Sequence, residues 1–143
     1  MTEANTWTNP NTEALREILR QTRTVAIVGA SANPSRASHE VWTYLKSASN
    51  YELYLVNPTI SKVDGARVYP SLADLPVRPD LVDVFRRHEF LPSVLKDTTG
   101  VGAKVLWLQL GLWHDQVARD GADAGLQVVM DRCLKVEHAR LLG

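Results

Sequence analysis

Residues 25–36 of the chain read Val-Ala-Ile-Val-Gly-Ala-Ser-Ala-Asn-Pro-Ser-Arg. The first four are apolar, as in a strand that is covered on both faces of a parallel sheet. Gly29 then allows a tight turn, and small polar residues lead into a helix that is expected to begin near Ser38. This order directs a helix N-terminus and unpaired backbone N–H groups at one place, where both stabilise negative charge. The stretch therefore predicts a strand, a turn and a helix that together bind phosphate.

Strand and helix patterns alternate along the rest of the chain. Apolar runs that end near turn residues predict five strands, over residues 24–29, 52–56, 80–85, 104–110 and 126–130. Apolar residues at helical spacing predict helices between them, such as the one that places Leu91, Val94 and Leu95 on one face. Strands that alternate with helices through short turns are typical of an open α/β fold with a mostly parallel sheet.

Length and composition indicate one domain. The chain has 143 residues, of which 45% are hydrophobic and 22% are charged, as is usual for a globular protein. We expect a loose tail over residues 1–10 and a single domain over residues 11–143. Sixteen basic residues balance 16 acidic ones. A net charge of zero argues against broad attraction to nucleic acid or to a membrane surface, so a small molecule is the expected partner.

The cysteine and histidine residues indicate a reducing compartment and no metal site. Cys133 is the one cysteine, so no disulfide can form within the chain, and we expect a cytoplasmic protein. Cys133 itself is expected as a small core residue rather than a nucleophile. The sequence has no apolar run of transmembrane length and no signal-peptide pattern at its N-terminus. The histidines show no metal-ligand spacing; they are His39, His88, His114 and His138.

Residues that suit ligand binding follow four of the predicted strands. In open α/β sheets, ligands bind outside the carboxyl ends of the strands, where the strand order reverses. The residues expected at these ends are Gly29, Ala30 and Ser31, then Asn57 and Pro58, then Phe85, Arg86 and Arg87, and finally Gln109, Leu110 and Gly111. Four clusters that converge on one crevice indicate a binding site more strongly than any one of them.

The turn after the first strand suits a phosphorylated ligand other than NAD or ATP. The dinucleotide fingerprint G-x-G-x-x-G keeps its first glycine as Gly29, but Ser31 and Pro34 replace the other two. The acid that would bind a ribose diol is replaced by Asn57 at the end of the second strand. The turn also lacks the phosphate-binding loop pattern of ATPases. Cations expected near the crevice suit a ligand with several negative charges; they are Arg36, Lys62, Arg86 and Arg87.

Motifs spread along the chain carry a family resemblance. They are Val28-Gly29-Ala30-Ser31, Arg36, Val56-Asn57-Pro58, Val68-Tyr69-Pro70-Ser71-Leu72, Asp83-Val84-Phe85-Arg86, Trp107-Leu108-Gln109-Leu110-Gly111 and Asp131-Arg132-Cys133. In this order they resemble the small stand-alone CoA-binding domain proteins, which are similar to the N-terminal domain of the succinyl-CoA synthetase alpha subunit. The resemblance covers nearly the whole chain after the tail. It implies a Rossmann-like three-layer α/β fold with a five-stranded, mostly parallel sheet that binds coenzyme A.

The resemblance also implies which residues hold coenzyme A. The loop from Ser31 to Pro34 and the turn near Gln109 are similar to CoA-contacting segments of the synthetase, and Lys62 is the nearest match to a contacting lysine. The family pattern favours Arg86 over Arg87. Backbone amides around residues 30–33 would hold the pyrophosphate. The expected site comprises Gly29, Ala30, Ser31, Ala32, Asn33, Pro34, Arg36, Asn57, Pro58, Lys62, Phe85, Arg86, Gln109 and Gly111.

Catalysis by this chain alone is not expected. The phosphohistidine of the synthetase lies in a further domain, and the sequence shows no nucleophile–base pair and no metal cluster. The prediction is therefore a protein that binds coenzyme A or acyl-CoA, or a regulatory module in which coenzyme A signals metabolic state. The alternative is an NADP-dependent or acyl-CoA-handling enzyme, which needs an organised acid or base at the crevice.

Overall fold

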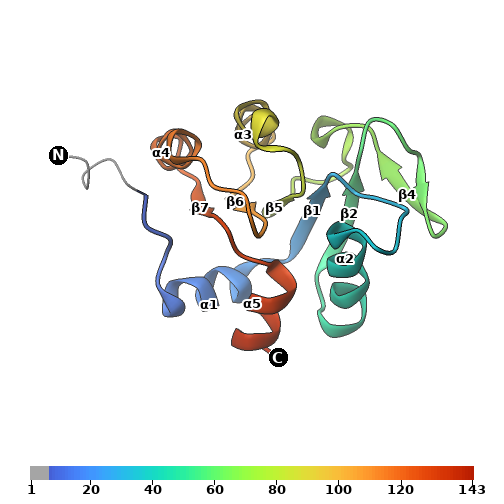
Figure 1. The fold of residues 1–143 in the computed structure, drawn as a ribbon, viewed down its shortest axis with the longest axis horizontal. Coiled ribbons are helices and arrows are strands. Elements are labelled where there is room, and N and C mark those ends of the chain that lie inside the picture. Colours follow the sequence, from blue (N-terminus) through green and yellow to red (C-terminus); the bar gives the residue numbers. More distant parts are fainter. Residues whose placement is uncertain (1–6) are drawn as a thin grey trace.

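A seven-stranded sheet runs through the protein, whose computed structural model describes residues 7–143. The strands lie in the order β3-β4-β2-β1-β5-β6-β7 (Figure 1), and neighbouring strands are parallel except for the antiparallel pair β3–β4. The strands are β1 (Thr24–Val28), β2 (Glu52–Val56), β3 (Lys62–Val63), β4 (Ala66–Tyr69), β5 (Leu81–Val84), β6 (Val105–Leu108) and β7 (Gln127–Val129). The helices are α1 (Thr12–Gln21), α2 (Ala37–Ala48), α3 (Leu91–Gly100), α4 (Asp115–Asp123) and α5 (Leu134–Leu141), with short 3-10 helices η2 (Leu72–Asp74) and η3 (His88–Phe90).

The helices form one layer on each face of the sheet. Helices α1, α2 and α5 lie on one side, and α3 and α4 lie on the other (Figure 1). Ile27 and Trp107 belong to the core under the first group, and Val28 and Leu106 to the core under the second. Central strands are thus buried on both faces, as their continuous apolar sequence requires. The predicted Rossmann-like three-layer α/β fold is confirmed.

The predicted number of strands is wrong, because the structure has seven rather than five. All five expected strands form, and β3 and β4 are added as a hairpin around Asp64 and Gly65, whose φ angles are +48° and +82°. Strand β4 also pairs in parallel with β2. Unlike the five expected strands, β3 and β4 have no continuous apolar run, because Lys62 and Arg67 interrupt them. With β4 included, the parallel strands take the doubly wound order, which reverses between β1 and β5.

The segment just before α1 lies against the sheet. Asn9 exchanges two hydrogen bonds with the backbone of Met130, and the Trp7 N–H donates to Asp115 Oδ1 at 3.1 Å. The Asn9 side chain therefore pairs with both backbone groups of Met130 just after β7, as the backbone of a neighbouring strand would. Residues 7–10 are part of the tail that the sequence analysis expects to be loose, and the rest of that tail lies outside the described residues. Asn11 caps α1, because its side chain accepts a hydrogen bond from the Ala14 N–H.

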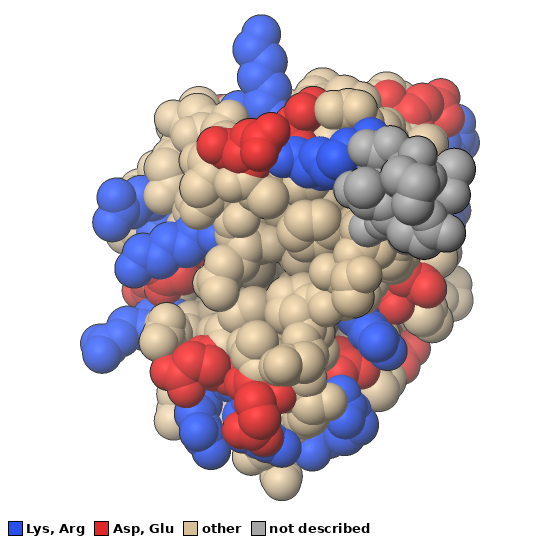
Figure 2. Space-filling model, turned by 90° about the vertical axis from the view of Figure 1, so that its left-hand side faces the viewer, with Lys and Arg blue, Asp and Glu red and all other residues tan. Residues whose placement is uncertain are grey.

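Charged side chains of both signs are dispersed over the face on which β7 forms the edge of the sheet. Figure 2 shows them around the rim of this face, with uncharged side chains in its hollowed centre. Neither sign gathers into the extended patch that non-specific attraction to a polyanion would use. Within residues 7–143, no helix is both long and apolar enough to cross a lipid bilayer.

A carboxyl group lies unpaired in the middle of the sheet. Asp83 of β5 has no exposed surface, and neither of its oxygens has a hydrogen-bond partner among residues 7–143. Its neighbours across the sheet are Ile27 on β1 and Trp107 on β6. Burial raises the pKa of Asp83 well above its ordinary value, because an apolar layer disfavours the charged form. The folded protein therefore binds this proton more tightly than the unfolded chain does.

Replacement of Asp83 by valine is expected to stabilise the protein. Asp83→Val removes an unsatisfied buried group, which costs about 1–3 kcal/mol. Relative to the variant, the wild type should be most stable at acidic pH and should lose stability as the pH rises from about 3.8 toward the folded-state pKa. Urea unfolding of both proteins between acidic and neutral pH measures this. As a control, Asp80→Val should destabilise, because Asp80 accepts the N–H groups of Arg23 and Thr24. If the free energy of unfolding depended on pH in the same way for the wild type and for Asp83→Val, this account of Asp83 would be contradicted.

Candidate functional site

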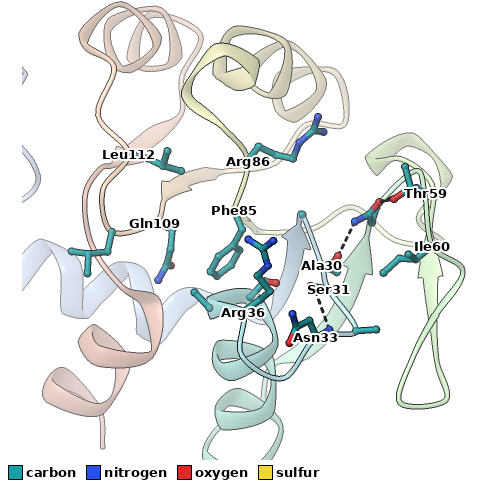
Figure 3. A pocket seen from close by; sticks show the side chains of 16 residues that line it. Ala30, Ser31, Asn33, Arg36, Thr59, Ile60, Phe85, Arg86, Gln109 and Leu112 are labelled. Atoms are coloured by element: carbon teal, nitrogen blue, oxygen red, sulfur yellow. Dashed lines mark hydrogen bonds between the residues drawn. The ribbon is translucent and has the colours of Figure 1, made fainter.

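A pocket of about 640 Å³ opens at the carboxyl ends of β1, β5 and β6. It lies where the strand order reverses, which is the ligand-binding position of doubly wound sheets. The start of α2 forms one wall and the end of β5 forms its centre (Figure 3). The pocket is lined by Gly29, Ala30, Ser31, Ala32, Asn33, Arg36, Ala37, Ser38, Asn57, Thr59, Ile60, Phe85, Arg86, Gln109, Leu110 and Leu112.

Gly29 is required by the close approach of two strand ends. Its φ is +94°, and a Cβ atom built on it would lie 2.5 Å from the carbonyl oxygen of Phe85. A side chain here would thus clash with backbone, which cannot move away as a flexible side chain can. The N–H groups of Gly29 and Ala30 both donate to the Val56 carbonyl, at 3.0 and 3.2 Å. These two amides extend the β1–β2 pairing and are already used by the fold.

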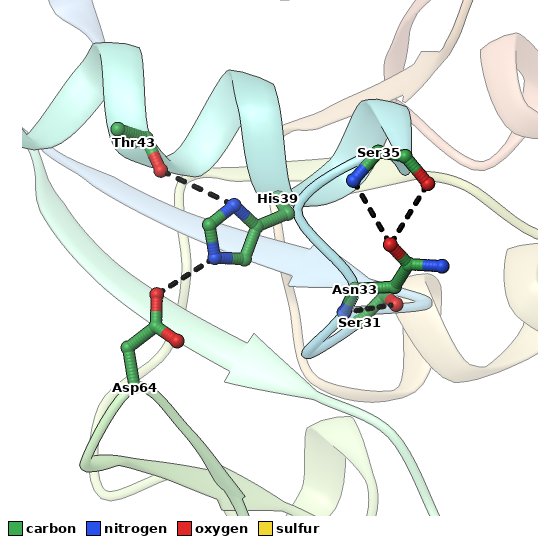
Figure 4. Close-up of polar contacts among 6 residues, drawn as sticks. All are labelled: Ser31, Asn33, Ser35, His39, Thr43 and Asp64. Carbon is green, nitrogen blue, oxygen red and sulfur yellow. Dashed lines mark hydrogen bonds and ion pairs between the residues drawn. The ribbon is translucent and has the colours of Figure 1, made fainter.

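The loop after Ala30 is held in shape by its own side chains. Ser31 Oγ accepts the Asn33 N–H, and Asn33 Oδ1 accepts both the N–H and the hydroxyl of Ser35 (Figure 4). The Arg36 N–H donates to the Asn33 carbonyl at 3.0 Å. Short polar side chains that bond to backbone two residues away stabilise such turns. The loop therefore has a defined shape without a ligand.

Free amides remain on both sides of this braced turn. Within residues 7–143, the N–H groups of Ser31 and Ala32, and those of Ala37 and Ser38 in the first turn of α2, have no acceptor. The N-cap residue Arg36 makes no side-chain cap bond. The helix N-terminus thus presents unpaired donors and its positive dipole end to the pocket. The available amides differ from the expected set around residues 30–33, because the amides of residues 30 and 33 bond to the protein itself.

Asn57 ties this loop to the end of β2. Its Nδ2 donates to the Ala30 carbonyl at 2.8 Å, and its Oδ1 accepts the N–H and the hydroxyl of Thr59. A second tie joins α2 to the β3–β4 hairpin, where His39 Nε2 lies 2.7 Å from Asp64 Oδ2 (Figure 4). These bonds hold the pocket wall made by Thr59 and Ile60 against the wall made by α2. Asn57 lines the pocket and also has a structural role.

Phe85 and Arg86 point to opposite faces of the sheet because they are successive residues after β5. Phe85 reaches into the pocket beside α2 (Figure 3). Arg86 lies on the border between this pocket and a hollow of about 410 Å³ on the α3 side, and its guanidinium stacks 4.4 Å from the centre of the Phe90 ring. Arg87 is exposed and lines neither space.

Gln109 forms the far end of the pocket. Its side chain is 95% buried and hangs beside Phe85 (Figure 3). Its Oε1 accepts the N–H of Leu134, at 3.4 Å, which places the first residue of α5 against it. The Nε2 group has no hydrogen-bond acceptor within residues 7–143, and Gln109 lines the pocket. Gln109 therefore offers a free amide donor to a ligand.

The structure brings most of the expected site residues together, but it leaves some of them outside the pocket. Pro34, Pro58, Lys62 and Gly111 do not line it. Lys62 is exposed on β3, and Pro58 lines the hollow on the α3 side. The sequence-based list omits lining residues Ala37, Ser38, Thr59, Ile60, Leu110 and Leu112. Ala37 and Ser38 could have been included, because the first turn of the helix follows directly from the predicted loop. Thr59 and Ile60 depend on the unpredicted hairpin.

Other titratable groups gather at the opposite edge of the sheet. A hollow of about 870 Å³ there is lined by residues that include Thr24, Glu52, Tyr51 and His138. Burial lowers the pKa of His138 and raises that of Tyr51 to about 12. Both shifts follow from packing between α2, α5 and the amino ends of the strands. In the described part of the chain, no three His, Cys, Asp or Glu side chains are placed to hold a metal ion.

Comparison with known proteins relates this geometry to a family. Residues 23–139 match the family model described as a CoA binding domain. The chain belongs to this CoA binding domain family. This CoA binding domain is 38% identical, over 131 residues, to the uncharacterized protein YneT of Bacillus subtilis (strain 168), a match that covers 92% of the chain and 96% of YneT.

A solved structure and part of a larger protein are also similar to this chain. A hypothetical protein from Pyrococcus horikoshii OT3 superposes with a TM-score of 0.88 at 35% identity, covering 96% of this chain and 99% of that one. The alpha subunit of acetate–CoA ligase (ADP-forming) II from Pyrococcus furiosus is 29% identical over 82 residues. That match covers 57% of this CoA binding domain but 18% of the ligase subunit, so most of the ligase subunit has no counterpart in the match.

Two glycine-to-alanine substitutions separate backbone strain from steric clash. Gly111 has a φ of +91°, like Gly29, but a Cβ on it would meet no atom within 4 Å. Gly111→Ala is expected to cost about 1–2 kcal/mol for left-handed backbone alone. Gly29→Ala should cost about 1–3 kcal/mol more, because the added methyl overpacks the Phe85 carbonyl. The free energy of unfolding in urea measures both. Equal losses would show that the approach of Gly29 to Phe85 is unimportant.

Proposed function

We propose that this protein binds coenzyme A, free or acylated, in the pocket at the carboxyl ends of β1, β5 and β6. The observation that carries the proposal is the set of four unpaired amides around a braced loop, in a chain of the CoA binding domain family. Two of these amides precede Asn33 and two open α2. Unpaired N–H groups at a helix N-terminus form an anion site for pyrophosphate. Because the loop is braced without ligand, little ordering entropy is lost on binding.

Arginine side chains supply the positive charge that a ligand with several phosphates requires. Arg36 is exposed at the mouth of the pocket, and among residues 7–143 no hydrogen bond or ion pair holds its guanidinium. It is therefore free to form paired hydrogen bonds with a phosphate. Arg86 keeps its stacking on Phe90 and contributes charge from the opposite side of the crevice.

The two ends of the pocket suit the two ends of coenzyme A. With the pyrophosphate at the start of α2, one arm of the pocket runs toward Thr59 and Ile60 and the other toward Gln109 and Leu112. The adenosine end bears a further phosphate, and the exposed Lys62 follows closely after Ile60. The uncharged pantetheine arm suits the other end, where apolar side chains lie beside the free amide group of Gln109.

A binding role is favoured over an enzyme because the pocket lining has no general acid or base. None of its sixteen residues is Asp, Glu, His, Cys, Lys or Tyr. Proton transfer in catalysis needs such a group within hydrogen-bond distance of the reacting atom. Our proposal is therefore a small-molecule-binding protein of the cytoplasm, which recognises its ligand and catalyses no reaction alone.

Ligand identity is tested by calorimetric titration. Coenzyme A should bind more tightly than NAD or NADP, because Asn57 replaces the acid that would bind the ribose diol and is itself engaged by Ala30 and Thr59. Acetyl-CoA should bind with similar affinity to coenzyme A. Equal or tighter binding of NAD would refute the proposed function.

The role of Arg36 is tested against that of Arg87. Arg36→Ala should weaken coenzyme A binding by about 1.5–3 kcal/mol, the value of a hydrogen bond to a charged group. This corresponds to roughly a tenfold to hundredfold rise in Kd. The matched control is Arg87→Ala, which removes an exposed arginine that does not line the pocket and should leave the Kd nearly unchanged. Equal effects of the two substitutions would show that the phosphates bind elsewhere.

A further inference from the structure

A leucine is held exposed at the far end of the pocket. Leu110 lines the pocket, yet it is 68% exposed, which is the largest exposed fraction among the large apolar side chains of residues 7–143. Leu112, from the same turn, also lines the pocket and is half-buried, because it packs against the core on the α3–α4 side. Exposed apolar surface at the lip of a pocket is typical of a place that a ligand covers.

The exposure of Leu110 follows from the turn that carries it. The Leu112 N–H donates to the Gln109 carbonyl at 2.9 Å, and Gly111 has a φ of +91°, as at the third position of a type II turn. Leu110 therefore takes the second position, at the tip of the turn. The Gly111 N–H donates to Asp131 Oδ1 at 2.7 Å, and the Asp131 N–H donates to the Leu112 carbonyl at 3.0 Å. These bonds brace the turn on the side away from the pocket and hold Leu110 at its lip.

Charged groups near this turn disfavour an anionic ligand group. Asp131 is exposed, and its carboxylate lies directly against the turn through the bond to the Gly111 N–H. The cations of the pocket lining come from other segments, with Arg36 at the start of α2 and Arg86 after β5. Lys135 of α5 is paired with a glutamate of α2, and Arg132 lines a separate hollow. A carboxylate placed at the tip of this turn would meet a like charge and no paired arginine donors.

We propose that the pocket selects coenzyme A thioesters of uncharged, aliphatic acids and that Leu110 contacts their acyl chain. The inference rests on the proposed function, because coenzyme A must first bind with its pantetheine arm toward Gln109 and Leu112. Free coenzyme A ends there in a small thiol, whereas a thioester continues from the same sulfur into an acyl chain. A chain laid over the turn would cover Leu110 and the neighbouring surface of Leu112. Burial of apolar surface on both partners then favours the thioester over free coenzyme A.

The test is calorimetric titration of the full chain with coenzyme A and with its acetyl, butyryl and hexanoyl thioesters. Acetyl-CoA should bind like coenzyme A, because its acyl group carries a single methyl. Each further pair of methylenes should lower the Kd by roughly threefold to tenfold, which is less than full burial gives because the turn stays open to solvent on one side. Succinyl-CoA matches butyryl-CoA in chain length but ends in a carboxylate, so it should lack this gain.

Three variants assign the gain to Leu110. In Leu110→Ser, the Kd values for coenzyme A and hexanoyl-CoA should become nearly equal, because the serine side chain offers little apolar surface. Leu110→Met, which keeps an apolar side chain of similar size, should retain most of the wild-type ratio between these two Kd values. The matched control is Val77→Ser, because Val77 is an exposed apolar residue that does not line the pocket. This control should keep the full wild-type ratio.

The outcomes separate this inference from the proposed function. If coenzyme A binds but its thioesters show no gain with chain length, the inference is overturned and the proposed function stands. The same holds if Leu110→Ser keeps the gain, or if succinyl-CoA binds as tightly as butyryl-CoA. If neither coenzyme A nor any of its thioesters binds, both fail.

Discussion

The contact between Gly29 and the backbone of Phe85 is the constraint on which the rest of the site depends. The end of β1 approaches the end of β5 so closely that a Cβ on Gly29 would lie 2.5 Å from the Phe85 carbonyl oxygen. This approach occurs where the strand order reverses. The segments that follow β1 and β5 therefore leave the sheet in opposite directions just beyond it. The space between them is the pocket, and its shape follows from a residue without a side chain.

Side chains then hold the loop after Gly29 in one shape. Asn57 bonds to the Ala30 carbonyl, and the Ser31, Asn33 and Ser35 side chains bond within the turn. The result is a preformed loop, in which the amides that face the pocket, and that we propose bind phosphate, are those the fold has not used. A ligand that meets such a site loses less binding free energy to ordering the protein. Asn57 and Asn33 line the pocket, but much of their hydrogen-bonding capacity is already occupied, because their side chains hold the loop in this shape.

The chemistry of the pocket lining bears on what the domain can do with a ligand. The pocket has arginine, amide and hydroxyl groups but no side chain that exchanges protons near neutral pH. Such a lining suits the binding role that we propose, because proton transfer in catalysis needs a general acid or base.

Local sequence determined the strand–turn–helix unit around Gly29, the five apolar strands and the helices, because each has an apolar run or period, or a turn residue, that acts over a few neighbours. The hairpin of β3 and β4 depended on pairing with β2, which no local period reports, and Thr59 and Ile60 entered the pocket with it. Tertiary structure also decided which polar groups remain free for a ligand. The amides of Ala30 and Asn33 and the side chain of Asn57 suit phosphate by residue type, yet each bonds to a partner that only the folded chain brings within reach. Hydrogen-bonding capacity is a property of the residue, whereas its availability is a property of the fold.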